Sequence, residues 1–195
     1  MMTEKEKAAA GLLYDANYDK HLKEERGTCL EKCYEYNQLH PCEKEKRKKL
    51  LKEIFGKVEG SIHIEQPFHC DYGYNIEVGD NFYMNYNGVI LDCAKVTFGH
   101  DVFVAPNCGF YCAGHPLDVE QRNQGLEYAY PITVGNNVWI GGNVVVLAGV
   151  TIGDHTVIGA GSVINKDIPS GVIAAGNPCK VIRTITDEDK KKYWK

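Results

Sequence analysis

Residues 134–164 read VGNNVWIGGNVVVLAGVTIGDHTVIGAGSVI and carry a branched apolar residue at every sixth position. An unbroken run with this period predicts a repeating structure rather than a set of independent strands. We call the periodic apolar residues anchors, and glycine directly follows four of them. The anchors are Val134, Ile140, Val146, Ile152, Ile158 and Ile164, and the glycines are Gly135, Gly141, Gly153 and Gly159.

Each hexad predicts one short strand and one corner. Because side chains alternate along a strand, the residue two positions before each anchor should also point inward. A glycine or asparagine after the anchor suits a sharp corner at which φ can be positive. Stacked hexads of this kind predict a parallel β-helix. The additional inward positions are Val138, Val144, Val150, Thr156 and Ser162.

A second array with the same period precedes this one. Its positions are Val78, Met84, Ile90 and Val96, after which the register shifts by two and continues at Phe98, Val104 and Phe110. The stretch 113–131 between the arrays has no period and predicts a loop that protrudes from the β-helix.

The segment 1–57 differs in character, with many Lys and Glu and few Gly, and it predicts helices. Leu39-His40-Pro41 interrupts the helical pattern, and the segment 50–55 carries an apolar stripe that needs a packing partner. We therefore expect an N-terminal helical segment over 1–57, a β-helix over 58–185 and a helical tail over 186–195.

Composition restricts the class of protein. A chain of 195 residues predicts one domain, and no apolar run approaches the roughly 18 residues of a membrane span. The net charge of -4 argues against nucleic-acid binding through a basic surface. The N-terminus lacks the apolar stretch of a secretory signal, so we expect a cytoplasmic protein. The eight cysteines then predict reduced thiols packed as small apolar groups, and the spacings Cys29/Cys33 and Cys108/Cys112 do not predict a metal site.

Three aromatic residues are expected to point outward. Trp139 and Tyr83 directly precede anchors, and Phe103 has the same phase. A large exposed aromatic on a flat face usually contacts a subunit or a ligand. The sequence leaves both possibilities open.

His115 is the candidate catalytic residue. It lies in Cys112-Ala113-Gly114-His115-Pro116, where the hexad register stops. An imidazole can take a proton from a hydroxyl and return it to a leaving thiolate at neutral pH. A surface histidine without a catalytic role is the alternative for a single residue in a loop.

Several segments together resemble the maltose and galactoside O-acetyltransferases, a family of hexapeptide-repeat acyltransferases. The similarity covers nearly the whole chain. It implies a triangular left-handed β-helix with three hexads in each coil, and acetyl transfer from acetyl-CoA to a sugar hydroxyl in a homotrimer with active sites between subunits. The segments are Asp71-Tyr72-Gly73-Tyr74-Asn75-Ile76, Asn81-Phe82-Tyr83-Met84-Asn85, Gly114-His115-Pro116, residues 131–141 and Ala175-Gly176-Asn177-Pro178.

The resemblance also implies site residues. His115 matches the general base, Asn85 the group that binds the acceptor and steadies the tetrahedral intermediate, and Glu127 a loop residue that orients the histidine or acceptor. The small residues Gly142 and Ala160, one coil apart, would leave a groove for a thin ligand. Lysine and arginine beyond it suit phosphates, although solvated surface lysines are the alternative. The acceptor set is Asp71, Tyr83, Asn85 and Phe103, and the CoA set is Trp139, Gly142, Ala160, Asn165, Lys166, Lys180 and Arg183.

Some positions depart from the family pattern. Cys93 stands where some relatives have a carboxylate, and Asp92 is adjacent to it. An N-terminal acidic contact with the acceptor is expected among Asp15, Asn17 and Asp19. We expect direct transfer without a metal rather than an acetylated Cys112.

Three other functions are compatible with the same fold. One is acetylation of an antibiotic. Another is a zinc lyase, for which His100, His115 and His155 are available. The third is a trimeric scaffold without catalysis.

Overall fold

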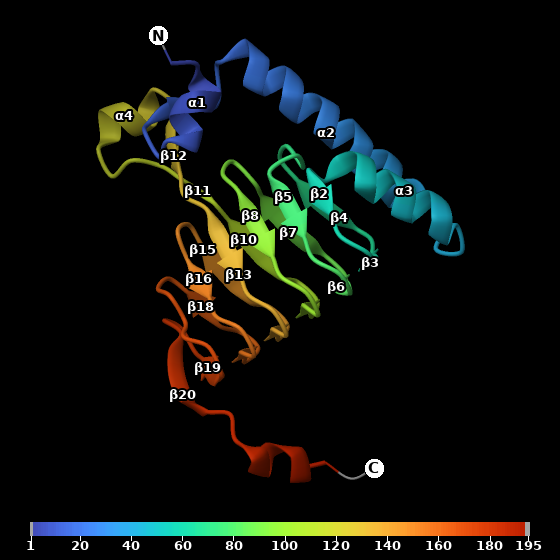
Figure 1. The fold of residues 1–195 in the computed structure, drawn as a ribbon. Helices are drawn as coiled ribbons and strands as arrows, with labels where there is room; N and C mark the ends of the chain where they lie inside the picture. Colours follow the sequence, from blue (N-terminus) through green and yellow to red (C-terminus); the bar gives the residue numbers. More distant parts are fainter. Residues whose placement is uncertain (1, 194–195) are drawn as a thin grey trace.

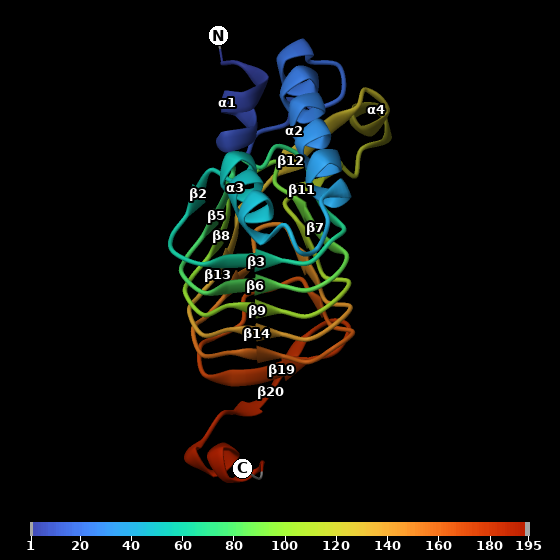
Figure 2. The same ribbon diagram turned by 90° about the vertical axis from the view of Figure 1, so that its right-hand side faces the viewer.

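The computed structural model describes residues 2–193, so residues 194–195 of the expected tail lie outside the described residues. Three sheets wind around one core, and each of the first five coils contributes one parallel strand to each sheet (Figure 2). The predicted parallel β-helix is therefore confirmed. We number the faces in the order in which the chain meets them. The first face contains β2 (Lys57–Val58), β5 (Ile76–Val78), β8 (Val96–Phe98), β13 (Ile132–Val134) and β16 (Thr151–Ile152).

The other two faces follow the same pattern. The second face contains β3 (Ile62–Ile64), β6 (Phe82–Met84), β9 (Phe103–Val104), β14 (Trp139–Ile140), β17 (Val157–Ile158), β19 (Val172–Ala175) and β20 (Lys180–Thr184). The third face contains β4 (Phe68–Cys70), β7 (Gly88–Leu91), β10 (Gly109–Tyr111), β15 (Val145–Leu147) and β18 (Val163–Ile164). We call the turn from the second to the third face the second corner, and the turn from the third face to the next coil the third corner.

The predicted inward positions form the core. Every anchor from Val78 to Ile164 is buried, as are the residues two positions before them in the later array. Phe98 lies between Phe82 and Phe110, with ring centroids 4.9 Å from each. Burying this apolar column is the main stabilising contribution that the hexad pattern supplies.

The prediction that the residue after an anchor adopts positive φ was wrong. Positive φ occurs three residues after the anchors, at Asn81, Asn137, Asn143 and His155 among others. The glycines after the anchors are required for a different reason, because the next coil passes directly over them. A Cβ on Gly141 would lie 2.7 Å from the backbone nitrogen of Ala160.

Coil length also departs in places from the expected three hexads. Thr133 pairs with Thr151, three hexads further along the chain, whereas Ile62 pairs with Phe82, so the early coils are longer by two positions. The extra positions lie at the third corner, between β4 and β5 and again between β7 and β8. These two additional residues explain why the register of the early array shifts by two after Val96.

The protruding stretch 113–131 leaves from the same third corner. It is not irregular: β11 (Ala113–Gly114) and β12 (Leu126–Ala129) pair antiparallel, and the short helix α4 (Val119–Asn123) lies between them. The N-terminal strand β1 (Tyr14–Asp15) adds to the outer edge of β12. Every insertion into the β-helix therefore lies at one corner.

Helices cover the N-terminal end of the β-helix (Figure 1). They are α1 (Glu4–Ala9), α2 (Lys20–Gln38) and α3 (Lys44–Ile54). Thr3 and Asp19 cap the starts of α1 and α2 through their side-chain oxygens. The apolar stripe of α3 is buried, as expected from Leu50, Leu51 and Ile54.

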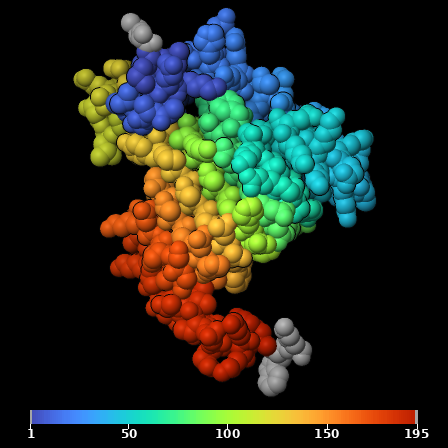
Figure 3. Space-filling model, in the orientation of Figure 1, coloured from blue at the N-terminus to red at the C-terminus, as the bar shows by residue number. Residues whose placement is uncertain are grey.

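The opposite end of the β-helix is closed differently. β20 folds back antiparallel on β19, and a 3-10 helix (Asp187–Lys191) follows it. The space-filling view shows this C-terminal segment extending away from the coils (Figure 3). Among the helices of residues 2–193, none is both long enough and apolar enough to cross a bilayer.

Candidate functional site

His115 lies directly after β11, where the loop leaves the third corner. Its side chain is half exposed, and its Nδ1 lies 3.1 Å from the carbonyl oxygen of Leu126. A carbonyl oxygen only accepts, so this contact favours the neutral tautomer that carries the proton on Nδ1. Nε2 then carries the lone pair, and this is the atom that can accept a proton.

Glu127 lies beside that lone pair. Its Oε1 is 3.9 Å from Nε2 of His115, too far for a direct hydrogen bond but close enough to stabilise an imidazolium. Its Oε2 accepts a hydrogen bond of 3.1 Å from the hydroxyl of Tyr14. Burial raises the pKa of that Tyr14 hydroxyl, so it remains a donor. The Tyr14 hydroxyl thereby fixes the Glu127 carboxylate through the oxygen that does not face His115.

The third corner also brings together two carboxyl groups, of Asp71 and Asp92, and the thiol of Cys93. The Cys93 thiol donates to Oδ2 of Asp71 at 3.3 Å. Oδ1 of Asp92 accepts from the backbone N–H groups of Asp71 and Tyr72, at 3.0 and 2.9 Å. The Cys93 side chain is therefore in contact with the Asp71 carboxylate, which lies one coil earlier.

Burial determines the protonation of these two carboxyl groups. It raises the pKa of Asp71, and it raises that of Asp92 to about 6, with the nearby charge of Asp71 adding to the shift. Asp92 is completely buried, and its Oδ2 has no hydrogen-bond partner. Of the two, Asp71 is partly exposed and can contact a ligand.

The three expected N-terminal residues do different things. Oδ1 of Asp15 accepts from the backbone N–H groups of Asn17 and Tyr18, and Asp15 pairs with Leu126 next to Glu127. The Asn17 amide donates to the carbonyl of Gly125. Asp19 caps α2. Asp15 and Asn17 therefore lie against the His115 loop, whereas the carboxylate of Asp19 is engaged in capping.

The predicted outward aromatics form one row on the second face. Tyr83 pairs with Phe103, and Phe103 pairs with Trp139, one residue per coil. Trp139 is 54% exposed and Phe103 43% exposed. His63 stacks on Tyr83 with ring centroids 5.5 Å apart. The row is a large apolar surface that a single chain leaves in water.

Gly142 and Ala160 lie at the second corner, on consecutive coils. The N–H of Gly161 donates to the carbonyl of Gly142, which joins the two turns. Asn85 lies at the same corner two coils earlier, and its Oδ1 accepts from the N–H of Tyr86. The Asn85 side chain keeps its amide N–H donors for other partners. The structure places Gly142 and Ala160 at one corner on adjacent coils, as expected, and Asn85 lies on the same edge.

The basic residues of the CoA set lie further along the β-helix. Lys180 and Arg183 are exposed on β20, while Asn165 and Lys166 are exposed at the third corner. Arg183 already has a partner, because both of its terminal nitrogens donate to the carboxylate of Asp189, at 2.8 and 2.6 Å. A ligand phosphate would have to compete with this ion pair.

The predicted site is split within one chain. His115, Glu127 and Asp71 belong to the third corner, whereas Asn85, Gly142 and Ala160 belong to the second, at the other edge of the third face. Residues 2–193 of a single chain therefore do not unite the expected base with the expected groove.

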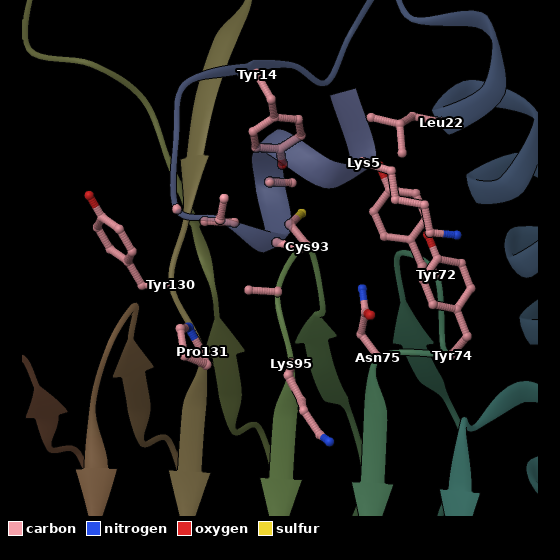
Figure 4. Close-up of a pocket in the computed structure, with 16 residues that line it drawn as sticks. Lys5, Tyr14, Leu22, Tyr72, Tyr74, Asn75, Cys93, Lys95, Tyr130 and Pro131 are labelled. Atoms are coloured by element: carbon pink, nitrogen blue, oxygen red, sulfur yellow. The ribbon is translucent and has the colours of Figure 1, made fainter. Parts of the chain in front are cut away.

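A cavity of about 560 Å³ lies behind the His115 loop (Figure 4). Residues of α1 form one wall, and Tyr14, Tyr72 and Cys93 line it, with the Tyr14 hydroxyl directed toward the Cys93 thiol. His115 and Asn85 are not among its lining residues. The cavity therefore adjoins the candidate site without containing the proposed base.

Sequence reasoning missed Tyr14 as a partner of Glu127 and Asp92 as the organiser of the Asp71 turn. The first contact joins residues 113 positions apart and depends on how the N-terminal segment returns to the loop. Asp92 was noted in the sequence as the neighbour of Cys93, but its hydrogen bonds to the backbone N–H groups of Asp71 and Tyr72 were not predicted. The histidines considered for a zinc lyase do not form a ligand set within one chain over residues 2–193.

The chain matches two family descriptions. Residues 7–60 match the maltose acetyltransferase hexapeptide capping motif, and residues 131–166 match the bacterial transferase hexapeptide with six repeats. A putative acetyltransferase of Saccharomyces cerevisiae is 56% identical over 94% of each chain.

Solved structures agree with these matches. A galactoside acetyltransferase in complex with coenzyme A is 48% identical, with a TM-score of 0.95 over 100% of this chain and 97% of that one. A maltose O-acetyltransferase from Clostridium difficile is 49% identical, with a TM-score of 0.93 over 95% of this chain and 99% of that one. The predicted left-handed β-helix with an N-terminal helical segment is thereby confirmed.

Proposed function

The chain belongs to the hexapeptide-repeat acetyltransferases of the maltose and galactoside type, and from that premise we propose that it acetylates a sugar hydroxyl with His115 as general base. It is an acetyl-CoA-dependent O-acetyltransferase. The proposal adds the acceptor class, the base and the arrangement of the site.

One observation carries the assignment of the base. The Leu126 carbonyl holds Nδ1 of His115, so Nε2 is free to accept a proton. Glu127, held by Tyr14, favours the imidazolium that forms when the proton arrives. Without this support the imidazole would have no fixed orientation in a half-exposed loop.

The reaction then proceeds by direct transfer in a ternary complex. Nε2 of His115 removes the hydroxyl proton as the acceptor oxygen attacks the thioester carbonyl, and the carbon–sulfur bond breaks. The imidazolium returns the proton to the departing thiolate of CoA. The Asn85 amide donates to the oxyanion of the tetrahedral intermediate. Cys112 is completely buried, which supports direct transfer over an acetylated cysteine.

We place the active site between the subunits of a homotrimer. The support is the split described above: the base lies at the third corner of one chain, and Asn85 and the Gly142 groove lie at the second corner of a neighbour. The exposed row of Tyr83, Phe103 and Trp139 lies on the second face, which ends at the second corner. Assembly would cover this row and unite the two halves.

The acceptor would contact Asp71, Tyr83, Asn85 and Phe103. A carboxylate such as Asp71 is a suitable partner for sugar hydroxyl groups, because it accepts hydrogen bonds from two neighbouring donors. Acetyl-CoA would lie along Trp139, Gly142 and Ala160 toward Asn165, Lys166, Lys180 and Arg183. The eight free cysteines support a cytoplasmic location, where thiols stay reduced.

The test is thiol release from acetyl-CoA with maltose, glucose, a galactoside and chloramphenicol as acceptors. We expect a sugar to stimulate release in the wild type, and His115→Ala to lose about two to four orders of magnitude in kcat. The matched control is His40→Ala, an exposed histidine between α2 and α3. Stimulation by chloramphenicol alone would favour an antibiotic acceptor, and an unchanged rate in His115→Ala would refute the base assignment.

A further inference from the structure

Three cysteines that were expected to pack as small apolar residues lie together where α2 contacts β4. Cys29 and Cys33 are one turn apart on the buried side of α2, and Cys70 is the last residue of β4. The sulfur of Cys70 is 3.5 Å from that of Cys29 and 3.7 Å from that of Cys33. All three sulfur atoms lie within 4.8 Å of one another.

We propose that Cys29, Cys33 and Cys70 form a three-thiolate binding site for a soft, monovalent metal ion of the Cu(I) class. Thiolates around one ion at a metal–sulfur distance of about 2.3 Å lie roughly 3.5 to 4 Å apart. The two shorter sulfur–sulfur distances are already in this range. Little movement of α2 or β4 would be needed to close the site on an ion.

The chemistry of the site selects the class of ion. Sulfur ligands favour soft ions such as Cu(I) over magnesium, calcium or manganese. A structural zinc site usually has four ligands, but among residues 2–193 no histidine, carboxylate or fourth cysteine joins this group. Three sulfur ligands without a fourth therefore suit an ion that accepts three-coordination. Binding displaces the thiol protons to solvent, one for each sulfur that coordinates as thiolate.

The surroundings hold the three sulfurs in register. The Asn37 amide donates to the carbonyl of Phe68 and accepts from the N–H of the same residue, each at 2.9 Å. The Tyr36 hydroxyl donates to the carbonyl of Ile64, at 2.5 Å. These contacts fasten the C-terminal half of α2 to β3 of the second face and β4 of the third face, and α2 lies over β4 (Figure 1). A preorganised ligand set binds an ion more tightly than a mobile one.

An ion also has a route to the site. Cys29 lines a cavity of about 260 Å³ formed by α2, Ile54 and the side chains of Tyr72 and Tyr74. Glu25 lies in the wall of this cavity, where its carboxylate accepts from the Lys5 ammonium group and the Tyr74 hydroxyl, and Lys32 also lines the cavity. The sulfurs themselves are shielded from water, with exposed fractions of 4% for Cys29, 1% for Cys33 and 2% for Cys70.

The test is transfer of Cu(I) from a chromophoric chelator to the full-length protein, reduced and under anaerobic conditions. We expect the wild type to take up one equivalent. Cys33→Ser and Cys70→Ser should bind at least tenfold more weakly, with Cys33→Ala and Cys70→Ala as alternatives if a serine variant does not fold. The matched controls are Cys108→Ser and Cys112→Ser, which alter buried cysteines outside the group and should keep wild-type uptake.

Two further measurements make the outcome decisive. A thiol count in denaturant should give eight free thiols before loading, and X-ray absorption of the loaded protein should show copper with sulfur neighbours only. Uptake that persists in both Cys33 and Cys70 variants would overturn the proposal. So would failure of the fully reduced wild type to bind, or a count of six thiols, which would assign two of these cysteines to a disulfide.

Discussion

At the scale of single residues, catalysis is proposed to depend on the fixed orientation of one imidazole. The Leu126 carbonyl determines which nitrogen of His115 is free, and Glu127 supplies a nearby negative charge. Neither partner is reactive by itself. A rate effect in either would therefore reflect positioning or charge rather than a lost proton acceptor.

The charge of Glu127 can be removed while its shape is kept. Glu127→Gln retains an oxygen for the Tyr14 hydroxyl but loses the carboxylate that favours the imidazolium. We expect kcat to fall about tenfold and KM for acetyl-CoA to stay unchanged. An unaltered kcat would instead show that the charge of Glu127 does not contribute to the rate.

Asp92 predicts a pH-dependent stability. Its pKa in the folded protein is about 6, above its ordinary value of 3.8. As pH rises between these values, the unfolded carboxyl ionises before the folded one, so the free energy of unfolding falls. Above about pH 6 this destabilisation is fully present, and below 3.8 it is absent.

Asp92→Asn removes the titration and keeps an oxygen for the backbone N–H groups of Asp71 and Tyr72. We expect the variant to be more stable than the wild type at pH 7, because it has no charge to bury. The gain is limited to about 1 to 2 kcal/mol, because the amide still leaves one buried group unpaired. Near pH 4 the gain should disappear. Urea unfolding across this range is the measurement, and a gain independent of pH would contradict the explanation.

At the scale of elements, the hexads predicted the core but not the shape of the corners. Periodicity identifies which side chains point inward, and every anchor is buried. It does not show which backbone of the next coil lies against a given residue. The requirement for glycine at position 141 is therefore seen only from the short distance between an added Cβ and Ala160. The loop 113–131 likewise contains a hairpin, and the strand that pairs with it, β1, comes from the N-terminal segment.

Adjacent glycines provide a matched test of that explanation. A Cβ on Gly141 would lie 2.7 Å from the next coil, whereas one on Gly142 would have its nearest neighbour at 3.4 Å. We expect Gly141→Ala to lower the free energy of unfolding by about 2 kcal/mol or more, and Gly142→Ala by less than about 0.5 kcal/mol. Gly142→Ala should instead raise KM for acetyl-CoA, because the added methyl group narrows the proposed groove. Equal destabilisation by the two changes would argue against coil contact as the reason for Gly141.

At the scale of the whole molecule, the two halves of the site lie on opposite edges of the third face. Inactive His115→Ala chains keep an intact second corner, and inactive Asn85→Ala chains keep an intact third corner. If neighbouring subunits share each site, an equal mixture of the two that is unfolded and refolded together should regain about a quarter of wild-type activity by random assortment.

The control is the same two proteins refolded apart and then mixed. They should remain inactive while subunit exchange is slow. Sedimentation or light scattering gives the number of chains in each assembly. A co-refolded mixture with no activity would contradict a site shared between subunits, because His115 and Asn85 of each site would then have to come from the same chain.

Every insertion into the β-helix enters at the third corner, which carries Asp71 and the His115 loop, whereas the proposed acetyl-CoA groove of Gly142 and Ala160 lies at the second corner. The segments 71–75, 92–95 and 113–131 lie outside the strands of the three faces, and an exchanged loop would have to retain His115 and Glu127. For protein engineering, this corner is a place to graft new acceptor loops onto an unchanged donor groove. In evolution, the same separation would allow new acetylated products to arise without loss of the acetyl-CoA supply that all of them share.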